Sequence, residues 1–339
     1  MRISPKRRLV PALLTALAAV LALVAPATSV AAPADIAAAA AAVEPAVVQI
    51  TTKIDYQQAI GTGTGMVIDP GGAVLTNYHV VAGANTITGT VGGRDYPIDL
   101  VGYDRKNDIA VLQLRGAGGL PAAPIGDSGQ IVVGEPTVGL GNARGMGAPL
   151  THETGPVTAL NRTVNAEDAL TGSSEEVNGL IEVAADVRPG DSGGPLVNGA
   201  GQVIGVVTAA TVNFQMGPAG KGFAIPINDA MAVAGQIRSG APSADVHIGQ
   251  PTLLGVGVGT QPRNGGGIIV RDVMIGGPAG QAGLAIGDVL TNLDGTDLDS
   301  ATTLTYVLDR HYPGDVVDLT WIDRSGQERT GKATLVSGP

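Results

Sequence analysis

The stretch that decides the fold runs from Arg188 to Val197 and reads Arg-Pro-Gly-Asp-Ser-Gly-Gly-Pro-Leu-Val. A serine lies between glycines in an expected tight turn, and an apolar run follows. Small residues let the backbone curl, so that successive amide N–H groups can converge beside the Ser192 hydroxyl. We expect the amides of Gly190, Asp191 and Ser192 to form this anion-binding site. A serine hydroxyl alone is a weak nucleophile, so the chain must also supply a base and an orienting carboxylate.

Two upstream segments contain those groups. Residues 76–81 read Thr-Asn-Tyr-His-Val-Val and offer His79 as the general base. Residues 104–111 read Asp-Arg-Lys-Asn-Asp-Ile-Ala-Val and offer Asp108 as the carboxylate. Asp108 directly precedes an apolar run that is expected to form a strand, so its side chain would lie at a sheet rim. Asp104 stays open as the alternative carboxylate. The order His, Asp, Ser is that of the chymotrypsin-type triad.

The serine segment also fits a second pattern, because residues 190–194 match G-x-S-x-G. In the α/β-hydrolases this pattern needs a helix directly after the serine, with the Asp and His downstream. Here Pro195 is followed by an extended run and an Asn-Gly turn, and the candidate Asp and His lie upstream. The residue order therefore favours the chymotrypsin-type arrangement.

The composition favours short strands around an aliphatic core. The 339 residues include 51 glycines and no cysteine, and aromatic residues make up 3%. Cores must be built from Val, Ile, Leu and Ala without disulfide bonds. Apolar runs expected to form strands lie at 47–52, 65–68, 73–76, 86–88, 109–114, 137–140, 179–183 and 203–207. Such strands predict a mainly β fold of closed barrels or sandwiches, and a helix over 227–237 would close this domain.

The N-terminal segment is typical of a secretory signal. Basic residues at 6–8 precede an apolar stretch from Leu9 to Val24, and small residues follow. We expect a signal peptide over residues 1–32, with cleavage near Ala31 or Ala32. A retained membrane anchor is the alternative, although the apolar stretch is short for a span of about 20 residues. An Ala-rich segment, 33–44, is expected to be poorly ordered or loosely helical.

Charge and residue spacing argue against several kinds of partner. The net charge is −10, which offers no electrostatic basis for binding nucleic acid. No cluster of His, Asp and Glu has metal-ligand spacing, and no motif calls for a cofactor. We therefore expect neither a metal nor a cofactor.

A second unit follows a small linker that we place at 239–250. Residues 251–339 contain strand candidates at 253–258, 268–273, 289–293, 316–321 and 332–335. A short helix is expected around 279–282. A longer helix should begin after Asp299 or Ser300 as its cap and run to about Arg310.

These segments together resemble the HtrA (DegP-like) serine proteases. The resemblance covers about residues 45–339. In its Ala/Gly-rich composition, the chain is similar to the secreted actinobacterial members of the family. The matching segments are residues 65–69, 75–81, 107–112, 189–195 and 222–227. The resemblance implies a chymotrypsin-like double β-barrel over 45–238 and a PDZ domain over 251–339. It further implies an endopeptidase, secreted or in the cell envelope, that acts on unfolded or misfolded proteins. Assembly into a homo-oligomer is compatible with the resemblance.

The resemblance also assigns a role to the start of the second unit. Leu253, Leu254, Gly255 and Val256 are similar to the carboxylate-binding loop of bacterial PDZ domains. Free amides there would bind a peptide C-terminus, and the peptide would add as a strand beside Val256. A small β-fold without a ligand is the alternative.

Two residues depart from the family pattern. Asp191 precedes the nucleophile, at a position where many members have Asn. Trypsin-like relatives also have Asp there and pair it with a new N-terminus, but the sequence has no Ile-Val-Gly-Gly start for that activation route. Asp186 lies six residues before Ser192, at the offset of the trypsin specificity carboxylate. We expect a substrate pocket of Asp186, Val206 and Thr208, in which Asp186 either selects Arg and Lys or turns outward to pair with Arg188.

Two other functions stay open at this point. The chain could be a peptide-binding chaperone whose catalytic site is in a resting state. It could also be an esterase, for which a PDZ domain would have no use.

Overall fold

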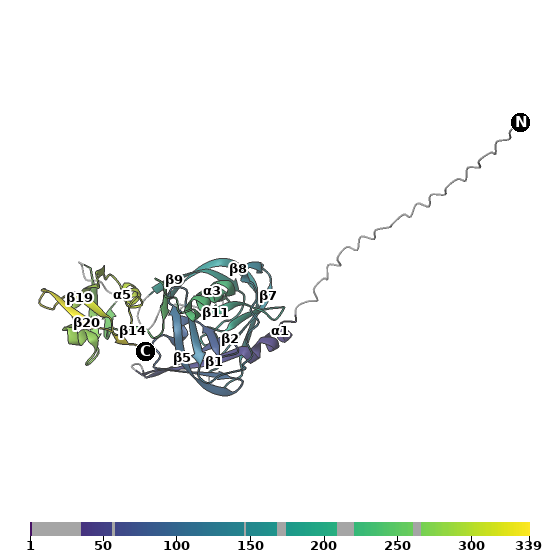
Figure 1. Ribbon diagram of the computed structural model, residues 1–339, viewed down its shortest axis with the longest axis horizontal. Coiled ribbons are helices and arrows are strands. Elements are labelled where there is room, and N and C mark those ends of the chain that lie inside the picture. The colour runs from purple at the N-terminus through teal and green to yellow at the C-terminus, as the bar shows by residue number, and fades with distance from the viewer. Residues whose placement is uncertain (2–34, 56–57, 146, 168–173, 209–219, 260–265) are drawn as a thin grey trace. The chain divides into compact units, whose positions relative to one another are not determined.

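The computed structural model describes residue 1 and residues 35–339, apart from 56–57, 146, 168–173, 209–219 and 260–265 (Figure 1). Residues Ala34–Pro339 form one compact unit. The signal segment and its cleavage position near Ala31 or Ala32 lie outside the described residues, apart from Met1. In the described part of the chain, no helix is long and apolar enough to cross a membrane.

The Ala-rich segment forms a capped helix that packs on the core. Helix α1 (Ile36–Val43) begins at Asp35, whose carboxylate accepts the amides of Ala37 and Ala38 at 3.1 and 3.2 Å. Asp35 satisfies two of the amides that a helix start leaves unpaired. Ala39, Ala40 and Val43 are buried on the same face, so the segment is more ordered than its composition predicts. A 3-10 turn, η1 (Glu44–Ala46), leads into the first strand.

Six strands form the first barrel. Their order in the sheet is β5-β4-β1-β2-β3-β6, and a further pairing of β5 with β6 closes the ring. Closure leaves no unpaired sheet edge in this ring. The strands are β1 (Val47–Ile54), β2 (Ala59–Asp69), β3 (Ala73–Thr76), β4 (Thr86–Val91), β5 (Arg94–Asp104) and β6 (Ile109–Leu114).

The second barrel is also closed and six-stranded, in the order β10-β11-β12-β9-β8-β7. It contains the serine segment, which lies between β9 and β10. The helix α3 (Ile227–Arg238) follows its last strand. The strands are β7 (Pro136–Gly141), β8 (Thr151–Glu167), β9 (Ser174–Val183), β10 (Pro195–Asn198), β11 (Val203–Thr208) and β12 (Gly222–Pro226).

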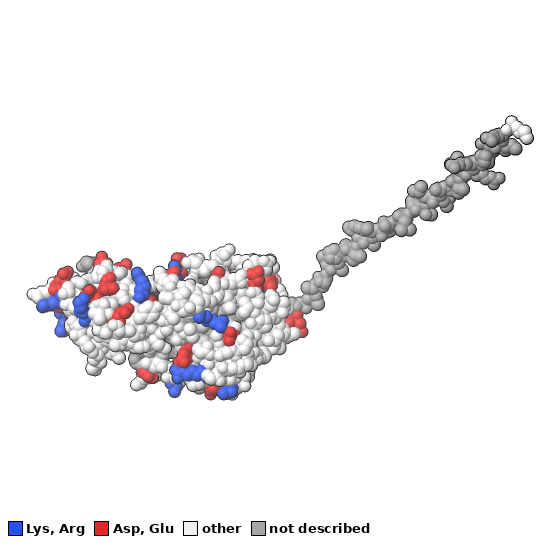
Figure 2. Space-filling view, in the orientation of Figure 1, with Lys and Arg blue, Asp and Glu red and all other residues white. Residues whose placement is uncertain are grey.

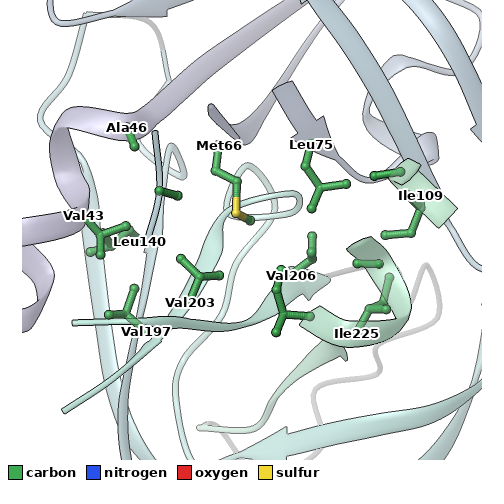
Figure 3. Close-up of a cluster of buried hydrophobic side chains, with 14 of the residues drawn as sticks. Val43, Ala46, Met66, Leu75, Ile109, Leu140, Val197, Val203, Val206 and Ile225 are labelled. Carbon is green, nitrogen blue, oxygen red and sulfur yellow. The ribbon is translucent and has the colours of Figure 1, made fainter. Parts of the chain in front are cut away.

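Aliphatic side chains from both barrels meet in one buried cluster (Figure 3). Met66, Leu75 and Ile109 come from the first barrel, and Leu140 and Val206 come from the second. All five are fully buried. Because this shared core fixes the barrels against each other, it also fixes the chain segments that end at their junction.

Part of the expected linker belongs to the first sheet. Strand β13 (Val246–Ile248) pairs antiparallel with β5, with Val246 opposite Asp104. The linker predicted over 239–250 is therefore wrong at these residues. The sequence Val-His-Ile is too short to indicate a strand without its partner.

The C-terminal unit combines a sheet with two helices. The sheet has the order β15-β16-β17-β19-β20, with β18 beside β17, and β14 pairs separately with β21. Helices α4 (Pro278–Ala282) and α5 (Ala301–Leu308) accompany it, and the Ser300 hydroxyl caps α5 through the Thr303 amide at 3.1 Å. The strands are β14 (Thr252–Leu253), β15 (Val256–Gly259), β16 (Ile268–Val273), β17 (Val289–Leu293), β18 (Thr296–Asp297), β19 (Val316–Ile322), β20 (Glu328–Thr334) and β21 (Val336–Ser337).

A buried ion pair fixes the end of α5. Arg105 Nε donates to Asp309 Oδ2 at 2.7 Å, and the Tyr103 hydroxyl donates to Asp309 Oδ1 at 2.6 Å. Both charged side chains are largely covered, so the loss of either partner would leave a buried charge unpaired.

Charged side chains on the surface are few and mixed in sign. On the face shown in Figure 2, acidic and basic residues lie in small groups among uncharged ones. Some of the charged residues of the described chain form ion pairs, such as Arg115 with Asp99 and Arg238 with Asp69. The net negative charge is therefore not gathered into one patch on this face.

Candidate active site

Two elements of the first barrel position the histidine and the aspartate. Strand β3 ends at Thr76, and His79 lies in the short helix α2 (Tyr78–Val81) directly after it. Asp108 is the residue before β6 and has a φ of 53°. The left-handed region is uncommon for residues other than glycine, and asparagine and aspartate tolerate it best. Strained positions of this kind concentrate at functional sites.

Asp108 faces His79 through both carboxylate oxygens. His79 Nδ1 lies 2.8 Å from Asp108 Oδ2, and the His79 backbone amide donates to Asp108 Oδ1 at 3.0 Å. Since an ionised carboxylate can only accept, Nδ1 has the proton in the neutral imidazole, and Nε2 is then the acceptor. The imidazole is 33% exposed and the carboxylate 7% exposed. The ring can therefore reach a substrate while its partner stays shielded from water.

Further hydrogen bonds hold Asp108 in place. Its backbone oxygen accepts the Asn77 side-chain amide at 2.9 Å and the Tyr78 amide at 3.2 Å. From the second barrel, the Thr208 hydroxyl donates to Asp108 Oδ2 at 3.4 Å. The carboxylate is thus fixed from two directions, which sets the orientation of the imidazole.

Asp104, the alternative carboxylate, does not contact His79. Its side chain accepts the backbone and side-chain amides of Asn107 at 2.9 and 2.7 Å. Burial raises the pKa of the Asp104 carboxyl, and the hydrogen bonds from Asn107 oppose that shift. Asp104 therefore stabilises the turn that presents Asp108.

The serine turn has the geometry of a type II turn. The Asp191 amide donates to the Arg188 carbonyl at 3.0 Å, Pro189 follows Arg188, and Gly190 has a φ of 99°. Proline and glycine are the preferred central residues of this turn. The prediction that the Asp191 amide faces an oxyanion is therefore wrong, because that amide is bonded within the turn. Within the described residues, the Gly190 amide donates no hydrogen bond.

Thr64 joins the serine turn to the first barrel. Its amide donates to the Ser192 carbonyl at 2.8 Å, and its hydroxyl donates to the Gly190 carbonyl at 2.7 Å. A Cβ at Gly193 would lie 2.0 Å from the Thr64 carbonyl, so only glycine fits there. Sequence reasoning missed Thr64, because it lies just before the strand expected over 65–68, whereas β2 begins at Ala59. The clustered glycines were the signal for this close approach.

Within the described residues, the three side chains expected to form a substrate pocket have different surroundings. Val206 is fully buried in the cluster between the barrels, and the Thr208 hydroxyl donates to Asp108 Oδ2. The Asp186 carboxylate is about half exposed and accepts from Arg188 Nε at 3.0 Å. Asp186 thus turns outward, because an ionic partner lies two residues away.

The expected carboxylate-binding loop lies at the open edge of the C-terminal sheet. Gly255 has a φ of 78° and directly precedes the edge strand β15, which begins at Val256. Leu254 is buried, and its carbonyl accepts the Ala279 amide at 2.9 Å. Among the described residues, neither the Leu254 amide nor the Gly255 amide donates a hydrogen bond. Such amides can donate hydrogen bonds to an anion, and the unpaired edge of β15 beside them can pair with an added strand.

No group of metal-ligating side chains was found in the described part of the chain. The polar residues of the site are a histidine, an aspartate, a serine and threonines. This set suits proton transfer and nucleophilic attack.

The two closed barrels and the site at their junction define the class of trypsin-like peptidases. The family model of the trypsin-like peptidase domain matches residues 63–206, and that of the PDZ domain matches residues 253–335.

Two curated relatives and one solved structure show how far the similarity extends. The chain is 34% identical over 310 residues to the serine protease PepD of Mycobacterium tuberculosis, covering 86% of this chain and 64% of PepD. It is 30% identical to the serine protease Do-like HtrA of Lactococcus lactis subsp. lactis, covering 84% of this chain and 73% of that protein. The HtrA-type protease AlgW with decapeptide matches at 27% identity with a TM-score of 0.52, covering 90% and 99% of the two chains.

The chain therefore belongs to the HtrA/DegP family of serine proteases with a PDZ domain. The expected family and the mainly β fold of barrels followed by a PDZ domain are confirmed. The chain spans a little under two-thirds of the length of PepD.

Proposed function

We propose that this chain is a serine endopeptidase that hydrolyses peptide bonds in unfolded or misfolded proteins. His79, Asp108 and Ser192 form its catalytic triad. The observation that carries the proposal is the two-point contact of Asp108 with His79, at 2.8 Å to the ring and 3.0 Å to the backbone amide. This contact directs Nδ1 at the carboxylate, and Nε2 would then act as the base.

The first half of the reaction acylates the serine. Ser192 Oγ attacks the substrate carbonyl carbon as its proton passes to His79 Nε2, and the carbonyl oxygen takes up the negative charge. Donors placed at that oxygen are worth about 10²- to 10³-fold in rate each. We assign this role to the amides of Gly190 and Ser192. The carbon–nitrogen bond then breaks, and His79 returns the proton to the leaving amine.

The second half regenerates the enzyme. Water gives a proton to His79 Nε2 and attacks the acyl carbon, and the ester bond to Ser192 breaks as the proton returns to Oγ. Asp108 stays ionised and stabilises the imidazolium in both halves. No metal or cofactor enters these steps.

The C-terminal unit would bind peptide C-termini. Support comes from the Leu254 and Gly255 amides and from the edge strand β15, which together offer a carboxylate site and a pairing partner. The apolar residues of the loop, Leu253, Leu254 and Val256, would favour an apolar last side chain.

We further propose that the protein acts outside the cytoplasm. Basic residues followed by an apolar stretch and small residues over 1–32 support export, because this order is that of a secretory signal. Assembly of several copies stays a prediction of the family resemblance.

Digestion of reduced casein tests the proposed activity. The parent chain should release peptides, and the Ser192→Ala variant should lose turnover by a factor on the order of 10⁶. The Ser239→Ala variant, which alters an exposed serine after α3, is the matched control and should digest casein normally. Equal digestion by the Ser192→Ala variant would overturn the proposal. Hydrolysis of small esters without cleavage of casein would favour an esterase.

A further inference from the structure

We propose that Thr151 is a positioning residue for the catalytic turn. Its hydroxyl and two backbone amides hold the buried Asp191 carboxylate, so that the turn keeps its shape without a freed N-terminal ammonium group. This inference rests on the proposed function, which it deepens by naming what keeps the oxyanion site formed.

The Asp191 carboxylate is surrounded by donors from three segments. The Thr151 hydroxyl, at the start of β8, donates to Oδ1, which also accepts the Ala143 amide at 3.1 Å. The Arg188 amide donates to Oδ2 at 3.0 Å. Asp191 is 3% exposed, and none of the described Lys, Arg or His side chains forms an ion pair with it. Hydrogen bonds from one hydroxyl and two backbone amides therefore stabilise the buried charge, and the nearby Arg188 charge adds to them.

The chain around the carboxylate is built to fit it closely. A Cβ at Gly141 would lie 2.1 Å from Asp191 Oδ1, and a Cβ at Gly190 would lie 2.7 Å from the Asn142 carbonyl. Both positions are glycine, so the strand end at Gly141 and the loop after it can approach the turn. The carboxylate thereby links the turn to the loop at Ala143 and to β8.

The donor set also explains why this position is aspartate and not asparagine. Both carboxylate oxygens accept, and two of the three donors are backbone amides that cannot reverse their role. An asparagine would direct its NH₂ group either at the Arg188 amide or at the Ala143 amide. Only the Thr151 hydroxyl could turn to accept. In either orientation one part-buried backbone amide would lose its acceptor, which is costly.

The consequence for catalysis follows from the position of Asp191. It lies between Gly190 and Ser192, the two residues whose amides are assigned to the oxyanion. If its side chain is released, the turn from Pro189 to Ser192 can change shape, and the Gly190 and Ser192 amides would no longer point at the same oxyanion. The effect should fall on the transition state more than on substrate binding, because the oxyanion forms only in the transition state.

The test compares full-length Thr151→Val, which lacks the hydroxyl at nearly the same shape, with Thr151→Ser, which keeps it. Thr154→Val, on the exposed face of the same strand, is the matched control. We expect Thr151→Val to lower kcat by about 10- to 100-fold, below the full effect of one oxyanion donor, with KM changed less than about twofold. Affinity for a peptide boronic acid, which forms a tetrahedral adduct, should fall in parallel with kcat.

Thr151→Ser and Thr154→Val should both stay close to the parent in kcat. A short N-terminal extension on the parent chain should leave kcat unchanged, because no N-terminal ammonium is required. An unchanged kcat in Thr151→Val overturns this proposal alone. The same holds if Thr151→Val changes KM and the melting temperature but leaves the affinity for the boronic acid at the parent value. A parent chain without Ser192-dependent turnover overturns both this proposal and the proposed function.

Discussion

Asp108 holds His79 at two points, by its ring at 2.8 Å and by its backbone amide at 3.0 Å. An asparagine at position 108 would keep the size of the side chain and lose an acceptor. The amide NH₂ of the asparagine could then donate to Nδ1, which would place the ring proton on Nε2. Nε2 could then no longer accept the proton of Ser192. We expect Asp108→Asn to lower kcat by about 10⁴-fold with an unchanged circular dichroism spectrum.

The matched control for that variant is Asp104→Asn. Asp104 is also buried, but it bonds to Asn107 and not to His79. The Asp104→Asn variant weakens at most one hydrogen bond to Asn107 in this turn, worth about 1 kcal/mol. The kcat of this variant should therefore stay within a few fold of the parent value. A larger loss in Asp104→Asn than in Asp108→Asn would show that the carboxylate is misassigned.

Residue preference at the cleavage site should not depend on Asp186. Its carboxylate is paired with Arg188 and partly solvated, so it offers little to a substrate cation. Profiling with a peptide library should give the same residue preference in the parent and in Asp186→Ala, without selection of Arg or Lys. Arg188→Ala, which releases Asp186 from its partner, provides the complementary variant. A preference for Arg or Lys that disappears in Asp186→Ala would contradict the pairing argument.

The PDZ unit should require a free peptide carboxylate. Calorimetry with the full-length Ser192→Ala variant avoids cleavage of the ligand. A peptide with an apolar C-terminal residue should bind, and its C-terminal amide should lose most of the affinity, because the Leu254 and Gly255 amides would then have no anion to bind. Equal affinity of the acid and the amide would rule out this binding mode.

Acid should weaken the second barrel through Glu182. Burial raises the pKa of this carboxyl, but hydrogen bonds from Thr158 and Lys221 and the charges of Lys221 and Arg162 outweigh it, and the pKa is lowered overall. A lowered folded-state pKa contributes stability above the unfolded value of about 4.5, and this stability is lost as the pH falls toward the folded value. Each 1 kcal/mol lost would lower Tm by roughly 2–4 °C in a domain of this size.

Melting curves of Glu182→Gln test this sign. Between about pH 5 and pH 3, the Tm of the parent should fall more steeply than the Tm of the variant, because only the parent takes up this proton. Glu328→Gln, at the exposed start of β20, should follow the parent. Parallel curves for the parent and Glu182→Gln would contradict the argument.

The motifs predicted the fold class and the meeting of His79 with Asp108, because both depend on local spacing at strand ends. Several strands were missed. Strand β5 contains Pro97 and three aspartates, and β8 is a 17-residue polar strand with a glycine and a proline. Neither has the apolar pattern that indicates a strand. Both form because a closed barrel pairs every strand on two sides, so exposed polar faces are tolerated.

The substrate pocket was the weakest prediction, since it depended on which way single side chains point. Val206 turns into the core between the barrels, and Thr208 turns to Asp108. Alternation along β11 places neighbouring residues on opposite faces, but the sequence does not state which face meets which barrel. Two of the three donors to Asp191 could not be predicted from the sequence, because Ala143 and Thr151 lie more than 35 residues upstream of it.

Covalent labelling of the serine tests the central claim most directly. A fluorophosphonate reacts with a serine only where a base and an oxyanion site activate it. Incubation of the full chain with this reagent at neutral pH should add one phosphonyl group, and peptide mass spectrometry should place it on Ser192. Labelling should be abolished in Ser192→Ala and strongly slowed in His79→Ala. An adduct on a different serine, or equal labelling of the parent and His79→Ala, would contradict the account.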